Sequence, residues 1–382
     1  MNQGSSIPAR ILFIVPRMPV GGAETFLISI LQRMDRHVIQ PVIFSMGRES
    51  DPMFLKIPDE IPRYIHARKW RYDLSPCTSI EKIIIDEKIQ TVVCADYFTY
   101  FYFRFAARRG TVNVRVVTLL HVTKPRSVKE FLHGFIFARM LRRSDEVLTT
   151  CENQKQFLSR LFYIPDNRFA KNIYNGIDTD YWTLATDPAI RSAKRSKYGI
   201  PENAVVIVNV AGFRREKRHD IMLKALAKIY LESPKRDYYL LFVGGGDKEL
   251  RAQSELLARE LNVTDRVIFA GVQADLRLMY WMSDIFTLGS TSETFSIAAL
   301  EAMASGLPCV LTNVGGADEM ITENVNGLLV DAGSPTSLAD GWIRCASLLN
   351  SFDSRKIRKS VTERFTLHKC ILNYEQYFSE KG

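Results

Sequence analysis

The sequence predicts an α/β protein made of two doubly wound domains, each with helices packed on a parallel sheet. Short, β-rich apolar runs alternate with segments of helical period along the whole chain, which is typical of βαβ units. The chain has 382 residues, and at roughly 100 to 200 residues per domain this length indicates two domains.

Two series of apolar runs give the expected strands. In the first half these runs are residues 11–15, 38–44, 90–95, 114–121, 146–151 and 169–174. In the second half they are residues 204–210, 238–243, 266–269, 285–288, 309–312 and a weaker 327–330. Residues 179–203, between the two series, are polar and contain Asp187-Pro188 and Ile200-Pro201, so they predict a linker with a short helix.

The composition excludes several classes of protein. With 46% hydrophobic and 24% charged residues, the chain is neither disordered, nor collagen-like, nor a coiled coil. No apolar run approaches the roughly 18 to 20 residues that span a bilayer, and residues 11–15 are too short for a signal peptide. The six cysteines lie far apart without a C-x-x-C pair, so we expect a reduced, cytoplasmic protein without a zinc site or disulfides.

The positive charge is confined to the N-terminal half. Residues 1–175 hold 26 Lys and Arg against 16 Asp and Glu, a net +10, whereas the rest of the chain has 25 against 26, a net −1. Within residues 101–143, ten basic side chains face a single acidic one, Glu130. This asymmetry predicts an anionic partner or surface.

Two glycines follow the first predicted strand. Gly21 and Gly22 lie at a strand-to-helix turn, where the missing Cβ lets another backbone or a phosphate come close. A tight packing turn is an equal alternative, because the pattern lacks the third glycine of a dinucleotide-binding fingerprint.

A second candidate site follows the predicted strand 285–288. A helix is expected from near Phe295 to just before Gly306-Leu307-Pro308, and the free N–H groups at its start favour a phosphate-bearing ligand. Glu293 and Glu301 are eight positions apart, just over two helical turns. Spacing alone favours a capping acid for Glu293 and a solvated helix residue for Glu301.

Taken in order, the motifs of this chain resemble those of a known family. Glu293 to Glu301 is an E-x7-E pattern, and its setting resembles that of the retaining, nucleotide-sugar-dependent GT-B glycosyltransferases called glycosyltransferase family 4, or glycosyl transferases group 1. The other matching segments are Gly21-Gly22-Ala23-Glu24, Asn175-Gly176-Ile177-Asp178, Arg214-Arg215-Glu216-Lys217-Arg218-His219-Asp220, Gly244-Gly245-Gly246, Phe269-Ala270-Gly271 and Val314-Gly315-Gly316-Ala317-Asp318-Glu319.

The resemblance covers nearly the whole chain and implies a domain arrangement. It implies the GT-B fold, in which two Rossmann-like domains face each other across a cleft. Residues 1–178 would bind the acceptor and residues 179–365 the nucleotide sugar. Residues 366–382 would form a final helix that crosses back to the N-terminal domain.

The resemblance also implies roles for individual residues. The implied catalytic residues are Glu293, which contacts the transferred sugar, His121, which lies beside it, and Lys217, which brings a cation to the diphosphate. Glu301 would hold the ribose hydroxyls of the donor. The implied donor-binding residues are Gly21, Gly22, Arg214, Lys217, Phe269, Phe295, Ser296, Ile297 and Glu301.

Two departures from the family pattern affect this site. Family members usually carry an arginine at the position of Gly212, and we expect Arg214 or Arg215 to replace it. Thr294 and Ser296 stand where glycines are common, which alters how closely the backbone approaches the diphosphate.

A metal site has one candidate motif. Asp178-Thr179-Asp180 is a D-x-D sequence, which holds a divalent metal in a different glycosyltransferase fold. Its position at the predicted linker favours a turn instead. We therefore expect no metal and no cofactor, with the nucleotide sugar as a substrate.

The basic, aromatic segments 97–109 and 131–143 suggest a surface role. Amphipathic helices there would rest on an anionic membrane, at the inner face, within reach of a lipid-linked acceptor. The alternative is that the aromatic side chains form domain core and the arginines a solvated face. Nucleic acid is not expected as a partner, because no nucleic-acid-binding module is recognisable.

Together these features predict a hexosyltransferase-like enzyme. It would move a sugar from a nucleotide-sugar donor to a hydroxyl of a glycan, lipid-linked or other acceptor, with retention of anomeric configuration, in cell-surface polysaccharide or glycolipid synthesis. Two alternatives stay open: a nucleotide-sugar epimerase of similar fold, which needs no acceptor, and a non-catalytic nucleotide-sugar-binding module.

Overall fold

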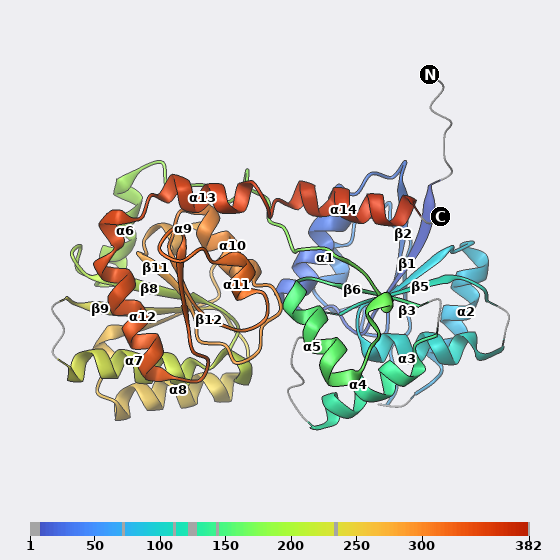
Figure 1. The fold of residues 1–382 in the computed structure, drawn as a ribbon, viewed down its shortest axis with the longest axis horizontal. Helices are drawn as coiled ribbons and strands as arrows, with labels where there is room; N and C mark the ends of the chain where they lie inside the picture. The colour runs from blue at the N-terminus through green and yellow to red at the C-terminus, as the bar shows by residue number, and fades with distance from the viewer. Residues whose placement is uncertain are drawn as a thin grey trace, which may run out of the picture. The chain divides into compact units, whose positions relative to one another are not determined.

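The computed structural model describes residues 8–70, 73–109, 112–120, 128–142, 145–232 and 236–380. The chain divides into two compact units, the first formed by Met1–Tyr174 with His368–Gly382 and the second by Asn175–Leu367 (Figure 1). The division falls a few residues before the predicted boundary at Asp178. The segment just before Asp178 is already attached to the second unit. Ile177 N–H donates to Phe365 O at 3.0 Å, and Ile177 O accepts from Leu367 N–H at 2.8 Å.

The described part of the first unit contains a seven-stranded parallel sheet in the order β3-β2-β1-β4-β5-β6-β7. The strands are β1 (Ala9–Val15), β2 (Ile39–Ser45), β3 (Arg63–Ile65), β4 (Thr91–Cys94), β5 (Arg115–Leu119), β6 (Glu146–Thr149) and β7 (Phe169–Asn172). The helices are α1 (Gly22–Arg33), α2 (Pro76–Asp86), α3 (Tyr97–Ala106), α4 (Val128–Met140), α5 (Glu152–Phe162) and, from the C-terminal end of the chain, α14 (Leu367–Ser379).

The described part of the second unit contains a six-stranded parallel sheet in the order β10-β9-β8-β11-β12-β13. The strands are β8 (Val205–Val210), β9 (Tyr238–Val243), β10 (Val267–Gly271), β11 (Ile285–Leu288), β12 (Cys309–Thr312) and β13 (Gly327–Val330). The helices are α6 (Pro188–Lys197), α7 (His219–Leu231), α8 (Lys248–Glu260), α9 (Arg277–Trp281), α10 (Ile297–Ala304), α11 (Ala317–Met320), α12 (Pro335–Ser347) and α13 (Ser354–Thr362).

These two sheets confirm the predicted pair of doubly wound domains. Most predicted strands agree with the structure to within a residue or two, although the run 114–121 narrows to Arg115–Leu119. Strand β3 was not predicted, because this short strand at the edge of its sheet carries an exposed arginine and has no apolar run. The helix expected from near Phe295 begins at Ile297, because the Ser296 hydroxyl caps it by accepting from Ala299 N–H at 3.3 Å.

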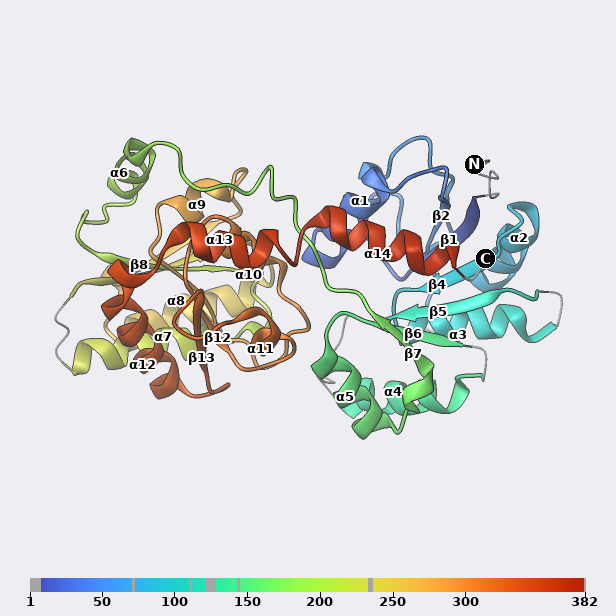
Figure 2. The same ribbon diagram turned by 45° about the horizontal axis from the view of Figure 1, so that its top comes forward.

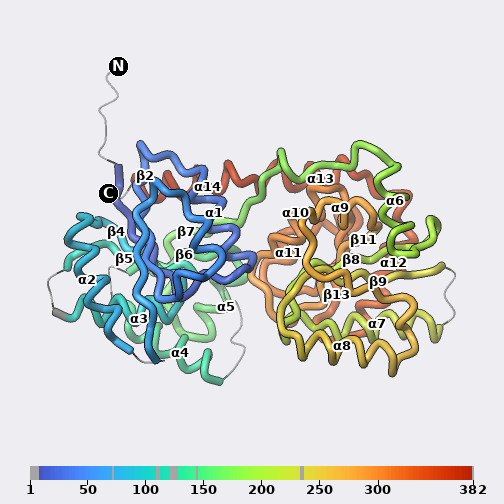
Figure 3. Tube along the Cα trace, turned by 180° about the vertical axis from the view of Figure 1, so that it is seen from behind, coloured from blue at the N-terminus to red at the C-terminus, as the bar shows by residue number. Residues whose placement is uncertain are grey.

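Each sheet has its own apolar core. In the first unit, Leu12 and Val42 pack with Tyr100, Phe137 and Phe162 from the helices α3, α4 and α5. In the second unit, the strands β8 and β9 pack against α7, α8 and α12, with Trp342 fully buried. Figure 3 shows α7 and α8 on the same side of this sheet. Strands that are buried on both faces explain why the apolar runs are nearly continuous rather than alternating.

The helix α3 corrects part of the membrane prediction. Tyr100, Tyr102 and Phe103 are buried, and Arg104 is only 7% exposed, where it forms an ion pair with Asp145 and donates to the Tyr100 hydroxyl. A charge is tolerated inside a protein only when it is paired and hydrogen-bonded. The aromatic side chains and Arg104 of α3 therefore belong to the core, and none of its side chains is fully exposed.

The predicted linker 179–203 belongs to the second unit. Arg195 on α6 is fully buried and binds the Asp284 carboxylate at 2.7 Å, and Arg191 reaches the same carboxylate at 2.5 Å. These ion pairs attach α6 to the segment before β11, so Arg191 and Arg195 help to pack this helix against the second unit.

The C-terminal helix α14 is part of the first unit, where Figures 1 and 2 show it beside α1. Glu375 accepts a hydrogen bond from Asp35 N–H at 2.7 Å. The Tyr377 hydroxyl donates to Glu146 at 2.6 Å, and Arg115 lies over the Tyr377 ring. Among the described residues, no helix is long and apolar enough to cross a bilayer.

Candidate functional site

The order of the strands marks one place in the second unit for a ligand. From β8 the chain continues to β9 on one side, whereas from β11 it continues to β12 on the other, so the order reverses between β8 and β11. Ligands of open α/β sheets bind outside the carboxyl ends of the strands at such a point. The loops 211–218 and 289–296 leave the sheet there.

These two loops are joined by an ion pair between Lys217 and Glu293. The Lys217 ammonium lies 2.9 and 2.5 Å from the two Glu293 carboxylate oxygens. Both side chains are partly buried, with 18% and 19% of their surfaces exposed. Thr291 N–H donates to Glu216 O at 2.9 Å and holds the loops together. The two opposite charges neutralise each other.

A glycine-rich loop after β12 holds the Glu293 segment in place. Gly316 N–H donates to Thr294 O at 2.8 Å, and the Thr312 hydroxyl donates to Ser290 O at 2.7 Å. Gly315 has φ +59°, and a Cβ on it would lie 2.6 Å from Thr294 O and still closer to Glu293 O. The Val314-Gly315-Gly316 motif therefore permits a backbone approach that a side chain would block.

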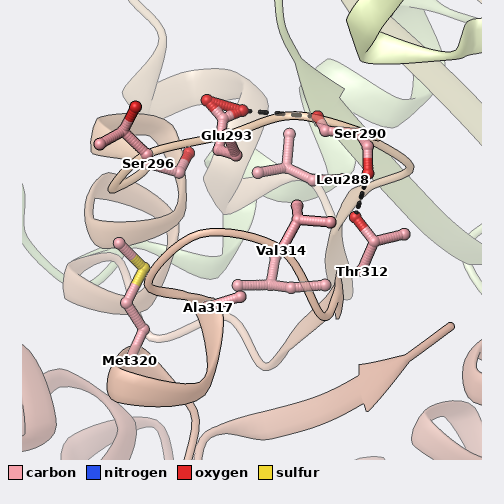
Figure 4. A pocket seen from close by; sticks show the side chains of 10 residues that line it. Leu288, Ser290, Glu293, Ser296, Thr312, Val314, Ala317 and Met320 are labelled. Atoms are coloured by element: carbon pink, nitrogen blue, oxygen red, sulfur yellow. Dashed lines mark hydrogen bonds between the residues drawn. The ribbon is translucent and has the colours of Figure 1, made fainter. Parts of the chain in front are cut away.

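Figure 4 shows the small hollow beside these loops. Leu288, Val314 and Ala317 lie in it as apolar side chains, and the Glu293 carboxylate lies next to Ser290. The free space here includes open solvent, so this feature is a shallow hollow beside the Glu293 loop and not an enclosed cavity.

Glu301 lies on α10, two turns beyond Glu293. It accepts a hydrogen bond from the Tyr280 hydroxyl at 2.9 Å. Burial raises the pKa of Glu301 to about 7, although the Tyr280 hydrogen bond acts in the opposite direction. The residue as a whole keeps part of its surface exposed, while its carboxyl group is surrounded by protein atoms. A carboxyl with such a raised pKa is typical of a functional site.

Three residues that were predicted to bind the donor, Phe295, Ser296 and Ile297, stand at the start of α10. The Phe295 side chain is buried against the Phe365 ring, so only its backbone can face a ligand. Its carbonyl accepts from the Asn175 amide at 3.0 Å. Ser296 caps α10, and Ile297 is the first residue of that helix.

Phe269 belongs to an aromatic cluster at the carboxyl end of β10. Its ring packs on Phe242 and Phe213, with centroids 5.4 and 6.2 Å apart, and His219 stacks on Phe213 at 4.2 Å. Burial, followed by the nearby charge of Lys217, lowers the pKa of His219 to about 4. The cluster therefore stays neutral and apolar at physiological pH.

The first unit holds the remaining predicted residues. Gly21 caps α1 with an extended backbone, and a Cβ on Gly22 would meet nothing within 4 Å. The loop before them is fastened to Asp51, whose carboxylate accepts from the Arg17 guanidinium at 2.8 Å and from Met18 N–H at 3.2 Å. His121 lies outside the described residues.

The sequence analysis assigned no role to three residues that shape these loops: Tyr280, Asp51 and Asn175. Tyr280 and Asp51 have no local signal, because each acts on a segment distant in sequence. Asn175 stood in a matched motif, yet its contact with Phe295 spans 120 positions.

The D-x-D sequence forms a turn. The Asp178 carboxylate accepts from the N–H groups of Asp180 and Tyr181, at 3.1 and 3.2 Å. Within the part of the chain that the structure describes, no group of three or more His, Cys, Asp or Glu side chains is arranged to hold a metal ion.

Two glycosyltransferase family models match the chain, one in each half. The model of glycosyl transferases group 1 matches residues 190–357, and that of glycosyltransferase family 4 matches residues 20–181. N-acetyl-alpha-D-glucosaminyl L-malate synthase of Bacillus anthracis is 32% identical over 217 residues, 56% of this chain and 55% of that protein. D-inositol 3-phosphate glycosyltransferase of Corynebacterium aurimucosum is 30% identical over 237 residues, 61% and 53% of the two chains. The chain thus matches about half the length of these relatives.

Solved structures share the fold. Anabaena HepE in complex with UDP superimposes with a TM-score of 0.82 at 20% identity, covering 97% of this chain and all of that one. A glycosyltransferase from Rickettsia africae gives a TM-score of 0.79 at 22% identity, with 98% of each chain covered.

Proposed function

This chain belongs to the glycosyltransferases that the two matched family models describe, and on that premise we propose that it transfers a sugar from a nucleotide-sugar donor to an acceptor hydroxyl. The observation that carries the proposal is the Lys217–Glu293 pair at the switch point of the second sheet. A cation and a carboxylate side by side at such a point support a donor whose diphosphate would meet Lys217 and whose sugar would meet Glu293.

The proposed chemistry follows from where charge develops. Cleavage of the anomeric bond leaves negative charge on the departing diphosphate, and a fixed cation there stabilises the transition state more than the ground state. Lys217 would exchange its partner Glu293 for the phosphate, and Glu293 would then be free to contact the sugar. Retention by front-face attack, with the leaving phosphate accepting the acceptor proton, and independence of metal are part of this proposal.

The donor and the acceptor are proposed as classes. HepE binds UDP and UDP-glucose, which supports uridine nucleotides as the first donors to test. The names of two relatives contain L-malate and D-inositol 3-phosphate, and both molecules are anions. Together with the net +10 of residues 1–175, this supports an anionic acceptor, including a lipid-linked one in the synthesis of a cell-surface glycan.

An association with the inner face of the membrane is also proposed, now through α4 alone. Val128, Phe131, Leu132 and Ile136 form a helical stripe and are 86%, 40%, 53% and 40% exposed. The opposite face of α4 packs through Phe137. An apolar stripe flanked by exposed arginines is typical of helices that lie on anionic bilayers. All six cysteines are buried thiols that form no disulfide in the structure, which supports a reducing, cytoplasmic location.

The proposal is tested by thermal shift and turnover in the presence of a chelator. UDP, GDP and ADP, and their sugars, are screened first; a ligand at 100 times its dissociation constant stabilises by about 2.7 kcal/mol. Release of the nucleoside diphosphate is then measured with and without acceptors such as malate and inositol phosphate. Acceptor-dependent release is expected. Conversion of the donor sugar without an acceptor would indicate the epimerase, and binding without turnover the binding module.

A further inference from the structure

The two central strands of the second sheet, β8 and β11, separate before they end. The ladder between them stops at the pair Phe286–Val208. In contrast, β8 stays paired with β9 as far as Val210, and β11 stays paired with β12 as far as Leu288. Each of the two strands therefore keeps its outer neighbour and loses its inner one. The two loops of the candidate site leave the sheet at this opening, which is where open α/β sheets bind their ligands.

A side chain spans the gap where the ladder stops. Asn209, the next residue of β8, donates from its amide nitrogen to Thr287 O at 2.9 Å, and Thr287 is the next residue of β11. The amide thus replaces a backbone bond that the separated strands do not form. Beyond the strand ends, Thr291 N–H donates to Glu216 O at 2.9 Å. These two bonds connect the loops at two points, one inside the core and one above it.

Asn209 is an unusual residue for this position. It is fully buried in a strand, Val205–Val210, whose other residues are all valine or isoleucine. Its amide oxygen, Oδ1, is buried and has no hydrogen-bond partner among the residues that the structure describes. A buried acceptor without a partner costs stability, and such a group in a native core calls for a reason other than packing.

The polar network on the other side of β11 provides a contrast. The Thr287 hydroxyl donates to Val310 O at 3.0 Å and accepts from the Trp342 indole N–H at 2.9 Å. Thr287 and Trp342 are both fully buried. This network joins β11 to β12 and α12 and contains no residue of β8. It therefore stabilises the core without setting the distance between the two site loops.

We propose that Asn209 is a positioning residue, which sets the separation of the Lys217 and Glu293 loops so that both can act on one nucleotide sugar. Because Asn209 is fully buried, it does not touch the ligand and acts through the carbonyl of Thr287 and the loop that follows β11. The unpaired Oδ1 is the cost in stability of this arrangement. The inference rests on the proposed function, because it assumes a donor at the switch point.

The test measures nucleotide affinity and melting temperature in the full chain. Dissociation constants of UDP, GDP and ADP are measured by calorimetry for the wild type and Asn209→Val. We expect the affinity for the nucleotide that binds to fall by about tenfold or more, because the charged hydrogen bond from Lys217 weakens when its loop shifts. The melting temperature should change by less than about 2 °C. Asn209→Val removes the unpaired Oδ1 but leaves Thr287 O without the amide donor, and these two effects have opposite signs.

Thr287→Val is the matched control. It keeps the backbone carbonyl that Asn209 binds, but it leaves the buried Trp342 N–H without its acceptor. We expect the melting temperature to fall by about 2 °C or more and the nucleotide affinity to change by less than about twofold. A purely structural role of Asn209 would instead make affinity follow melting temperature in both variants.

A second variant covers the case in which valine does not fit at this position. Asn209→Ala introduces no larger side chain, and at an equal loss of melting temperature it should still bind the nucleotide more weakly than Thr287→Val. Failure of both Asn209 variants to fold, unchanged affinity in a folded one, or an equal loss of affinity in the Asn209 and Thr287 variants would each overturn the assignment. A wild type that binds none of the three diphosphates would overturn the proposed function as well. Wild-type binding with unaffected Asn209 variants would contradict only the role of Asn209.

Discussion

At the scale of single residues, the Tyr280–Glu301 hydrogen bond sets the chemistry of the carboxyl that is proposed to hold the ribose. Burial raises the pKa of Glu301 to about 7, above the usual value of 4.5, and the Tyr280 hydroxyl limits that rise. Because the pKa is raised, the proton on Glu301 stabilises the folded chain at low pH, and this contribution is lost as the pH rises through about 7. Ribose hydroxyls donate best to the ionised form.

Nucleotide affinity should therefore increase with pH through about 7. In Tyr280→Phe, the pKa of Glu301 loses its lowering partner, so we expect the midpoint to move to higher pH and the affinity at pH 7 to fall by about tenfold. Calorimetry from pH 5.5 to 8.5 measures both effects. Tyr230→Phe, which removes a hydroxyl that donates to Tyr238 O elsewhere in the same unit, is the control. The affinity for a nucleotide without ribose hydroxyls should not change in Tyr280→Phe. An equal loss of affinity for nucleotides with and without these hydroxyls would contradict the proposed role of Glu301.

At the scale of structural elements, the loop after β12 positions Glu293 through Gly315. Gly315→Ala should combine the strain of a left-handed backbone, about 1–2 kcal/mol, with a clash against the carbonyls of Glu293 and Thr294. We expect a lower melting temperature and at least about a tenfold loss of nucleotide affinity. Gly333→Ala is the matched control, because Gly333 has φ +79° and open space around its Cβ position. Unchanged affinity in Gly315→Ala would show that the loop does not position the site.

The exposed apolar stripe of α4 gives a second prediction at this scale, which concerns binding to lipid vesicles. Leu132→Gln/Ile136→Gln should reduce binding to vesicles containing anionic lipid by about tenfold or more, because it replaces two of the four apolar side chains of the stripe. Flotation with neutral and anionic vesicles, at low and high salt, measures this binding. Leu231→Gln/Leu256→Gln, two similarly exposed leucines on α7 and α8, should bind like the wild type. Equal wild-type binding to neutral and anionic vesicles would contradict the membrane proposal.

At the scale of the whole molecule, the two ends of the chain share one core. Phe378 on α14 is 2% exposed within the first unit, although it follows the entire second unit in sequence. We expect Phe378→Ala to destabilise the first unit by about 3–5 kcal/mol. Hydrogen exchange should then be faster in β1 to β6 while β8 to β13 keep their protection.

Leu372→Ala on the same helix is the control for this experiment. Leu372 is 48% exposed, so its truncation should change stability by less than about 0.5 kcal/mol. A uniform loss of protection in both sheets after Phe378→Ala would contradict the assignment of α14 to the first unit's core.

The sequence by itself determined the two parallel sheets, and its resemblance to a family supplied the residues that are proposed for the site. Buried parallel strands need continuous apolar runs, and helices need a 3.6-residue period, so both leave a local signal. The candidate site residues Glu293, Glu301 and Lys217 came from the resemblance to family motifs, because the spacing of the two glutamates alone favoured structural roles. Strand β3 had no such signal and was missed.

Only the tertiary structure decided which distant residues meet. Lys217 and Glu293 are 76 positions apart, and Asn175 and Phe295 are 120 apart. It also decided that Arg104 is a buried ion-pair partner, that α4, unlike α3, keeps exposed apolar side chains, and that the Arg214 side chain lies beside Gly212. The physical reason is that hydrophobic period and turn chemistry are set by neighbours in sequence, whereas ion pairs, close glycine contacts and burial depend on which loops the sheet order brings together.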